Sequence, residues 1–446
     1  MRIALRYSAV VLAGVIAAAL IVAQPLLALI AAAGLVVLLS LGLIGPYWSV
    51  IIAGFLLTAV PKAGVKVGGF PFPFMLFGLV VAAAVILYQQ RGRLDAIPQP
   101  VFVVVGVVIV WFLARASMLA VSGASPFQLV PLAAWFVGPA ILLALAPKQA
   151  SDVNWARAME AGVLAACGLS IVQAIVGVER TLVPGITLAF GDDFASKHVL
   201  ITTVGFGSFY KIPSSYQNGN TFGVITGFFL VTALRRILTG DRGRWNWILL
   251  SATAVASVLA GSRTVIIAVA VASVLVMWAH GSLTHKLAIV VGVVLVAAVA
   301  VRLQPGLAER FSLSSITDSQ GAGRTARWRE VIDQQGLTGL GFGTSAWLTG
   351  PSSEGVFGAA EQVGIFGVGA LMVLALRVTR HGPLRQWRFP LVVILVCFLL
   401  DSSYLLFPTL FIPFVRMWSP FSLSRDEADH GTDLSARGRL DVMTAS

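Results

Sequence analysis

Long apolar runs recur along almost the whole chain, and they constrain the fold more than any other feature of the sequence. The chain has 446 residues, of which 58% are hydrophobic and 11% are charged. A water-soluble core does not need this much apolar sequence, whereas a helix that crosses a bilayer needs about 20 predominantly apolar residues. A transmembrane β-barrel would instead show alternating segments of about ten residues. The sequence therefore predicts an all-α, polytopic bundle of transmembrane helices.

Turns and charges divide the apolar sequence into candidate spans within one transmembrane domain, residues 1–418. Two of these spans, 47–60 and 405–418, are short enough to be re-entrant, so we expect twelve to fourteen helices. The polar and aperiodic segment 419–446 is expected to be a disordered cytoplasmic tail. The candidate spans are 5–23, 26–44, 47–60, 73–88, 101–121, 127–146, 155–178, 219–238, 245–261, 264–280, 286–301, 356–377, 389–403 and 405–418.

Lysine and arginine residues in the short loops set the expected orientation. One set of helix borders is rich in them, and the opposite short borders hold little beyond Lys62 and Lys66. By the positive-inside rule both termini are cytoplasmic, and two long polar loops, roughly 179–219 and 302–355, face outward. The rule also accounts for the net charge of +12, so no nucleic-acid partner is expected. The basic borders include Arg2, Arg6, Arg91, Arg93, Arg157, Arg235, Arg236, Arg242, Arg244 and Arg388.

One arginine stands almost alone between two apolar segments. Residues 245–261 and 264–280 meet at Gly261-Ser262-Arg263-Thr264, where little else is polar. Placing a guanidinium near hydrocarbon costs about 2.5–3.5 kcal/mol at the centre of a bilayer, so such residues usually serve a site. We therefore expect Arg263 to lie on the same side of the membrane as the two long loops and to belong to a functional site.

The first long loop ends in a polar cluster, Ser214-Ser215-Tyr216-Gln217-Asn218-Gly219-Asn220, at the start of the next helix. Two interpretations are open. Asn and Gly are expected in turns and at helix N-caps, and the same side chains could bind sugar hydroxyls. The aromatic and β-branched residues of the loop suggest ordered structure on the membrane surface. Asp192-Asp193 lacks further carboxylates nearby, so it is weak evidence for a metal site.

The second long loop carries Arg324, Arg327 and Trp328 at helical spacing. Arg324 and Arg327 would share one helix face, with Trp328 adjoining Arg324 at i+4. Two guanidiniums on one face suit a diphosphate, because each can bind two phosphate oxygens at once. An interfacial amphipathic helix with solvated arginines and a tryptophan at the membrane boundary would show the same pattern.

Two carboxylates follow the second loop. Glu354 is expected at the outer end of a helix near these arginines, where it could act as a general base on a sugar hydroxyl. The same place also suits an acid that only stabilises the helix N-terminus. Glu361 lies deeper, where an acid needs a partner or a function. The five histidines form no metal-ligand or triad grouping on one side of the membrane, so we expect neither a metal nor another cofactor.

Taken in order, these motifs resemble those of the O-antigen ligase/polymerase superfamily over roughly residues 200–370. This resemblance implies a GT-C-like membrane fold in which Arg263, Arg324 and Arg327 hold a pyrophosphate. Asn218, Asn220 and Trp328 are the accompanying candidate substrate-binding residues. The shared signs are Asn-Gly-Asn at 218–220, Ser-Arg-Thr at 262–264, Gly-Arg…Trp at 323–328, Gly-x-Gly-Phe-Gly at 339–343 and Glu…Gly-Ile-x-Gly at 361–367.

Two details favour the polymerase branch of this superfamily. Its ligases carry a His-Asn-type pair about eleven residues before the Gly-x-x-Gly, and that place holds Ser353-Glu354 here, without a histidine. Some polymerases show an Arg-x10-Gly spacing in two outer loops, and Arg180 to Gly191 and Arg310 to Gly321 fit it. Arg180 is therefore a further candidate substrate-binding residue.

The resemblance implies an inverting, metal-independent glycosyltransferase on the outer face of the bacterial inner membrane. It would polymerise O-antigen or exopolysaccharide repeat units, transferring a glycan from an undecaprenyl-pyrophosphate donor to a lipid-linked acceptor. Glu354 or Glu361 would take the acceptor proton. Membrane lipids, a chain-length regulator and a flippase are the expected partners. One alternative is a ligase that transfers glycan to lipid A core, and a second is a transporter or flippase of lipid-linked sugars, which should show inverted repeats and mid-membrane charges.

Overall fold

The computed structural model describes residues 46–61, 64–67, 70–73, 152–181, 200–202, 208–216, 218–280 and 388–400, with single positions between 282 and 302. Six of the predicted spans, those that begin at residues 47, 155, 219, 245, 264 and 389, are confirmed as helices with ends shifted by a few residues at most. The other predicted spans and the tail 419–446 lie outside these ranges. The helices are α3 (Pro46–Ala59), α7 (Asp152–Val176), α9 (Gly219–Leu238), α10 (Arg244–Leu259), α11 (Arg263–His280) and α18 (Arg388–Leu400).

Within the described ranges, three helices are long and apolar enough to cross a membrane, and they indicate a multi-pass membrane protein. They are Ala156–Val176 within α7, Gly219–Leu238 and Arg263–His280. A helix rises 1.5 Å per residue, so about 20 residues span the roughly 30 Å of hydrocarbon in a bilayer. The composition that predicted membrane spans from sequence is therefore realised as helices of membrane-spanning length.

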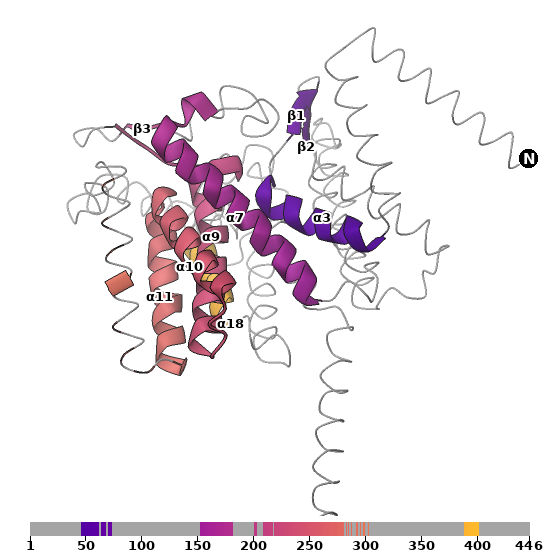
Figure 1. Cartoon of the computed structure of the whole chain (residues 1–446). Helices are drawn as coiled ribbons and strands as arrows, with labels where there is room; N and C mark the ends of the chain where they lie inside the picture. The colour runs from indigo at the N-terminus through magenta and orange to yellow at the C-terminus, as the bar shows by residue number, and fades with distance from the viewer. Residues whose placement is uncertain are drawn as a thin grey trace, which may run out of the picture.

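The core of the described bundle is built around α9, which α10, α11 and α18 surround (Figure 1). Within its candidate span, 83% of the α9 residues are buried, against 22% for α11. One face of α11 packs inward through Val265, Ala268, Ala272 and Val276. Its other face exposes large apolar side chains, a pattern typical of a helix whose outer surface contacts lipid. These exposed residues include Ile267, Val271, Val274, Leu275 and Trp278.

A stripe of glycines lets α9 and α11 approach closely. Gly219, Gly223 and Gly227 recur every four residues, so they share one face of α9. A Cβ on Gly227 would lie 2.6 Å from Val269 Cγ2, and one on Gly219 would lie 2.6 Å from the Ala260 carbonyl oxygen. Small residues at this spacing are a common means of helix association in membranes. The stripe therefore fixes the start of α9 against the turn that joins α10 to α11.

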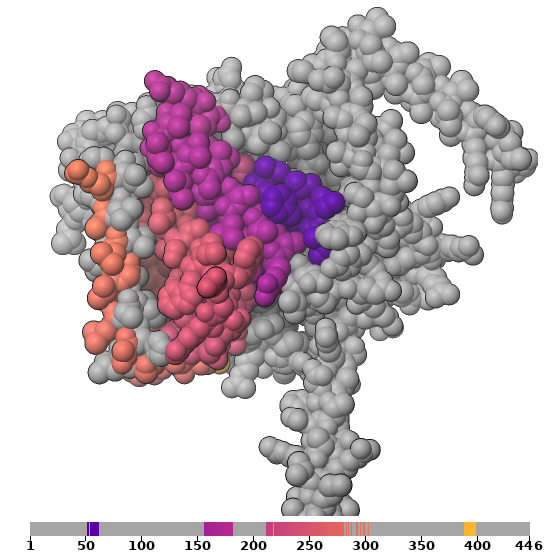
Figure 2. All heavy atoms as spheres, viewed as in Figure 1, coloured from indigo at the N-terminus to yellow at the C-terminus, as the bar shows by residue number. Residues whose placement is uncertain are grey.

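α7 crosses the bundle obliquely, and α3 packs beside it (Figure 2). The hydroxyl of Thr58 in α3 donates a hydrogen bond of 2.7 Å to the Met159 carbonyl of α7. Because this hydroxyl is buried, the bond satisfies a polar group that would otherwise destabilise the packed helices. α3 and α7 thus form a second layer beside the helices that surround α9.

The part of the chain that the structure describes also contains two antiparallel hairpins outside the helices. β1 (Gly64–Val67) pairs with β2 (Phe70–Pro73), and β3 (Leu200–Thr202) pairs with β4 (Ser208–Tyr210). The all-α prediction holds for the layers of the bundle, and these short strands are additions to it. Ordered structure was expected in the loop 179–219, and β3 with β4 supplies part of it. The strands are only three or four residues long, too short for the sequence periodicity to reveal them.

Candidate functional site

A small apolar cluster joins three segments at one end of the bundle. Val178 follows α7, Ile212 precedes α9 and Leu259 ends α10, and their buried side chains pack together. The backbone N–H of Ile212 also donates to the Leu259 carbonyl at 3.2 Å. Segments far apart in the sequence are therefore held at one place, which we call the Arg263 end of the bundle.

Each of the three segments carries a basic residue near its apolar anchor. Arg180 lies in the short turn η3 (Glu179–Thr181), Lys211 lies directly before Ile212, and Arg263 begins α11. Arg180 is exposed, whereas Lys211 and Arg263 are partly exposed. Among the described residues at this end, Glu179 is the one acid. We call Arg180, Lys211 and Arg263 the basic cluster, and its net positive charge favours an anionic ligand.

The first turn of α9 places two predicted asparagines beside the basic cluster. Asn218 is the N-cap of α9, and its side-chain oxygen accepts from the backbone N–H of Asn220 at 2.8 Å. The capping interpretation of Asn218 is therefore confirmed. The side-chain oxygen of Asn220 accepts a hydrogen bond of 2.8 Å from Lys211 Nζ. The helix start and the preceding loop are thus joined by polar contacts that remain partly exposed.

The turn between α10 and α11 presents Arg263 at the same end. Gly261 has a φ of +63°, a conformation that glycine adopts without strain, and it ends α10 so that α11 can reverse direction. Ser262 is buried, and its carbonyl accepts from the Ile266 N–H at 3.1 Å. The Nε of Arg263 is shielded from solvent although the side chain as a whole is partly exposed. The Arg263 side chain is therefore half-buried at this end of the bundle.

Thr221 adds a polar group directly after Asn220. Its hydroxyl is fully buried and has no hydrogen-bond partner among the described residues. Buried hydroxyls usually have a partner, so an orphan one next to a charged cluster is consistent with a polar ligand site. Cations, an amide and a hydroxyl together suit a ligand that combines phosphate oxygens with sugar hydroxyls.

The serines and the tyrosine of the predicted polar cluster have a structural role instead. Ser214 has a φ of +51°, and its N–H donates to the Gln173 side chain at 2.8 Å. Ser215 donates to the Ala59 carbonyl, and the Tyr216 hydroxyl donates to the Thr58 carbonyl at 2.6 Å. Burial raises the pKa of Tyr216 well above its ordinary value, so the phenol stays a neutral donor. These groups hold η4 (Ser214–Tyr216) against α3 and α7, and they are not available to a substrate.

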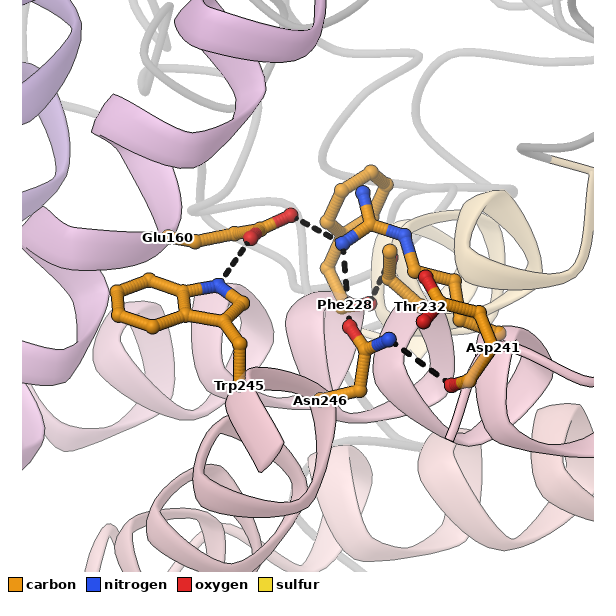
Figure 3. Close-up of polar contacts among 7 residues, drawn as sticks. Glu160, Phe228, Thr232, Asp241, Trp245 and Asn246 are labelled. Carbon is orange, nitrogen blue, oxygen red and sulfur yellow. Dashed lines mark hydrogen bonds and ion pairs between the residues drawn. The ribbon is translucent and has the colours of Figure 1, made fainter. Parts of the chain in front are cut away.

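The opposite end of the bundle holds a buried carboxylate that the sequence reasoning missed (Figure 3). Glu160 of α7 is fully buried, and its oxygens accept from Arg236 at 2.5 Å and from the Trp245 indole at 2.6 Å. Asn246 lies 3.5 Å from Arg236 and donates to the Asp241 carbonyl at 3.0 Å. We call this the Arg236 end. The sequence feature that could have revealed this site is the presence of an acid inside the apolar run 155–178, because a carboxylate within a membrane span needs a partner.

The remaining predicted site residues, Arg324, Arg327, Trp328, Glu354 and Glu361, lie outside the described residues. Of the predicted set, Asn218 and Asn220 lie in contact at the start of α9, and Arg263 and Arg180 lie at the same end of the bundle. Lys211 and Thr221 join them without having been predicted. No family model, no curated protein and no solved structure matches the chain.

Proposed function

We propose that the chain polymerises repeat units of a surface polysaccharide, using a glycan carried on polyprenyl pyrophosphate as the donor. One observation carries this proposal. The packing of Val178, Ile212 and Leu259 gathers Arg180, Lys211 and Arg263 at a single end of a membrane bundle. A cluster of cations at a membrane boundary matches the chemistry of a lipid pyrophosphate, whose charge must stay at the surface while its chain lies in hydrocarbon.

Different residues at the Arg263 end would bind the pyrophosphate and the sugar of such a donor. Arg263 and Lys211 would bind the pyrophosphate, and their positive charge would stabilise the charge that develops as it leaves. Asn220, which already pairs with Lys211 at 2.8 Å, and the orphan hydroxyl of Thr221 would bind sugar hydroxyls. Arg180 is the most exposed member of the basic cluster and would contact the phosphate from the side of the loop.

The proposed reaction is an inverting transfer. The acceptor hydroxyl oxygen forms a bond to the anomeric carbon while the bond from that carbon to the pyrophosphate oxygen breaks. The pyrophosphate leaves with the electron pair, and a carboxylate takes the acceptor proton. Glu354 or Glu361 would supply that carboxylate, as the sequence predicts. This chemistry requires no metal, because the cations already offset the charge of the leaving group.

Orientation is part of the proposal. The Arg263 end would face outward and the Arg236 end would face the cytoplasm, as the distribution of short-loop arginines predicts. Cysteines introduced at exposed Arg180 and exposed Arg244 test this in intact cells with a membrane-impermeant thiol reagent. Labelling at position 180 and protection at position 244 are expected. The reverse pattern would contradict the proposed orientation.

The decisive experiment is turnover of a polyprenyl-pyrophosphate repeat unit by the full chain reconstituted in vesicles. Wild type is expected to lengthen the lipid-linked product. Arg263→Ala should reduce the rate at least tenfold, in the range found when a donor to a developing anion is removed. Arg244→Ala, which removes an exposed arginine from the opposite end, is the matched control and should retain wild-type turnover. Equal rates for Arg263→Ala and wild type would overturn the proposed site.

The same vesicles separate the alternatives. Transfer that occurs only when lipid A core is supplied, with no lengthening in its absence, would identify a ligase. Movement of the intact lipid-linked sugar between leaflets, without any new glycosidic bond, would identify a transporter or flippase. Product lengthening without lipid A is the outcome that supports a polymerase.

A further inference from the structure

At the Arg236 end, the ends of α9, α11 and α18 carry a second group of cations that the proposed reaction does not use. Arg235 lies in the last turn of α9, His280 ends α11 and Arg388 begins the described part of α18. The Arg388 guanidinium lies 4.4 Å above the Phe389 ring, and the His280 ring lies 5.7 Å from the same ring at a steep angle. Arg388 and His280 therefore both contact the same aromatic side chain, Phe389.

The charge of this group is not balanced within the described part of the chain. Arg235 is close enough to Arg388 and Arg236 for their charges to repel. Among the described residues the one ion pair joins Arg236 to Glu160, so Arg236 is neutralised while Arg235 and Arg388 have no carboxylate partner there. The Nε of Arg235 is buried and has no hydrogen-bond acceptor among the described residues. Like charges held together with a buried donor favour an anion between them.

Exposed tryptophans show at which depth of the membrane this group lies. Trp278 is 85% exposed and precedes His280 by two residues, and Trp247 is 48% exposed in the first turn of α10. Both lie at the Arg236 end, and exposed tryptophans gather at the headgroup level of membrane proteins. The exposed apolar face of α11 ends at Trp278. Arg235, His280 and Arg388 therefore lie where lipid phosphates lie, at the boundary between hydrocarbon and water.

We propose that Arg235, His280 and Arg388 bind the phosphate of an anionic phospholipid in the leaflet at the Arg236 end. Basic pockets between helices on the cytoplasmic side of a membrane are known to select anionic headgroups. The two arginines would bind the phosphodiester oxygens, and the imidazole would add a further N–H donor. A bound lipid would offset the repulsion between Arg235 and Arg388, and it would thereby hold the ends of α9 and α18 together. This inference goes beyond the polymerase proposal and does not depend on it.

The test compares lipids that differ in charge. The full chain in neutral detergent is titrated with phosphatidylglycerol or with phosphatidylcholine, and retained lipid is counted by native mass spectrometry. Wild type is expected to retain phosphatidylglycerol in preference. Arg235→Gln with Arg388→Gln should weaken its binding roughly 25-fold, taking about fivefold for each arginine lost at an anionic surface. Equal retention of the two lipids by wild type, or unchanged affinity in the double variant, would overturn the proposal.

A matched control removes the same charge elsewhere. Arg157→Gln with Arg244→Gln changes two exposed arginines at the same end and should leave phosphatidylglycerol affinity within about twofold of wild type. An equal loss in both double variants would mean a diffuse charge effect and would overturn the assigned site. If the Arg235/Arg388 double variant folds poorly, the single variants replace it, and each should lose about fivefold.

A further arm distinguishes lipid from free anion. Inorganic phosphate, at the concentration of phosphatidylglycerol that saturates wild type, should leave the thermal unfolding midpoint unchanged. Phosphatidylglycerol should raise that midpoint in wild type and not in Arg235→Gln with Arg388→Gln, since binding to the folded state alone raises apparent stability. Equal protection by inorganic phosphate would overturn the lipid assignment.

Discussion

The buried network around Glu160 and the basic cluster at the Arg263 end use charged residues in opposite ways. At the Arg236 end, Glu160 is fully buried and both of its oxygens accept short hydrogen bonds from partners on α9 and α10. At the Arg263 end, exposed or partly exposed cations lie at the edge of an apolar cluster, near a buried hydroxyl without a partner among the described residues. A satisfied network holds helices together, whereas a partly satisfied one is available to a ligand. Stability should therefore respond most to mutations in the Glu160 network, and turnover to mutations in the basic cluster.

The largest expected effect is on stability, from Glu160→Ala. This change removes one partner of a buried pair and leaves Arg236 and the Trp245 indole without their acceptor. Breaking such a pair typically destabilises a protein by about 3–5 kcal/mol. Thermal unfolding of the detergent-solubilised chain should show a large drop in midpoint, while turnover per folded molecule stays near the wild-type value.

A double variant distinguishes the loss of the ion pair from a loss of packing. Glu160→Ala combined with Arg236→Ala should recover part of the lost stability, because no unpaired guanidinium then remains. If the stability losses of Glu160→Ala and Arg236→Ala simply add in the double variant, Glu160 and Arg236 do not act as a pair. The contrast between the buried network and the basic cluster would then lose its main support.

The next effect in size is expected at the contact between α9 and the turn that carries Arg263. A Cβ on Gly219 would lie 2.6 Å from the Ala260 carbonyl oxygen, so Gly219→Ala should shift the start of α9. Overpacking of this kind costs about 1–3 kcal/mol, and activity should fall further than the stability loss explains. Unfolding midpoints and turnover measured on the same samples test this.

Gly168 in α7 provides the matched control. A Cβ there would meet nothing within 4 Å, so Gly168→Ala should stabilise the helix by up to about 1 kcal/mol. Wild-type activity in Gly219→Ala would mean that the geometry of the α9 start does not matter for the site.

Tyr216→Phe should affect stability by a similar amount, without overpacking the site. It removes the hydroxyl that donates to Thr58 and leaves a carbonyl without its donor, which costs about 1–3 kcal/mol. Because the pKa of Tyr216 is raised from its ordinary value of 10.0 in the folded state, the unfolded phenol ionises first as pH rises. Wild-type stability should therefore fall above about pH 10, and Tyr216→Phe should lack this part of the fall.

Unfolding midpoints of both proteins between pH 7 and pH 11 measure this difference. The gap between wild type and Tyr216→Phe should narrow above pH 10. A constant gap over the whole range would mean that the phenol is not buried as described, and that η4 does not anchor the Arg263 end to α3 and α7.

The helices could be predicted from the sequence because hydrocarbon demands long apolar runs, and α9 starts and ends at the predicted residues. The hydrogen-bond partners of the side chains could not be predicted from the sequence. Glu160 and Arg236 are 76 residues apart, and Tyr216 bonds to a carbonyl 158 residues away. No local pattern encodes such contacts. Asn218 shows the intermediate case, since a helix N-cap is a local feature that its residue type already indicated.

The smallest effect on stability, combined with a clear effect on activity, is expected from Lys211→Met. Lys211 donates to Asn220 at 2.8 Å at a partly exposed position, so the loss of this bond should cost no more than about 1 kcal/mol. If Lys211 binds the pyrophosphate, turnover should nevertheless fall about tenfold or more, and Lys211→Arg should recover part of it by restoring the charge. Turnover at saturating donor, with unfolding midpoints as the reference, measures both quantities. If stability and turnover fall in the same proportion, Lys211 has a structural role rather than a substrate-binding one. The basic cluster would then resemble the buried network around Glu160.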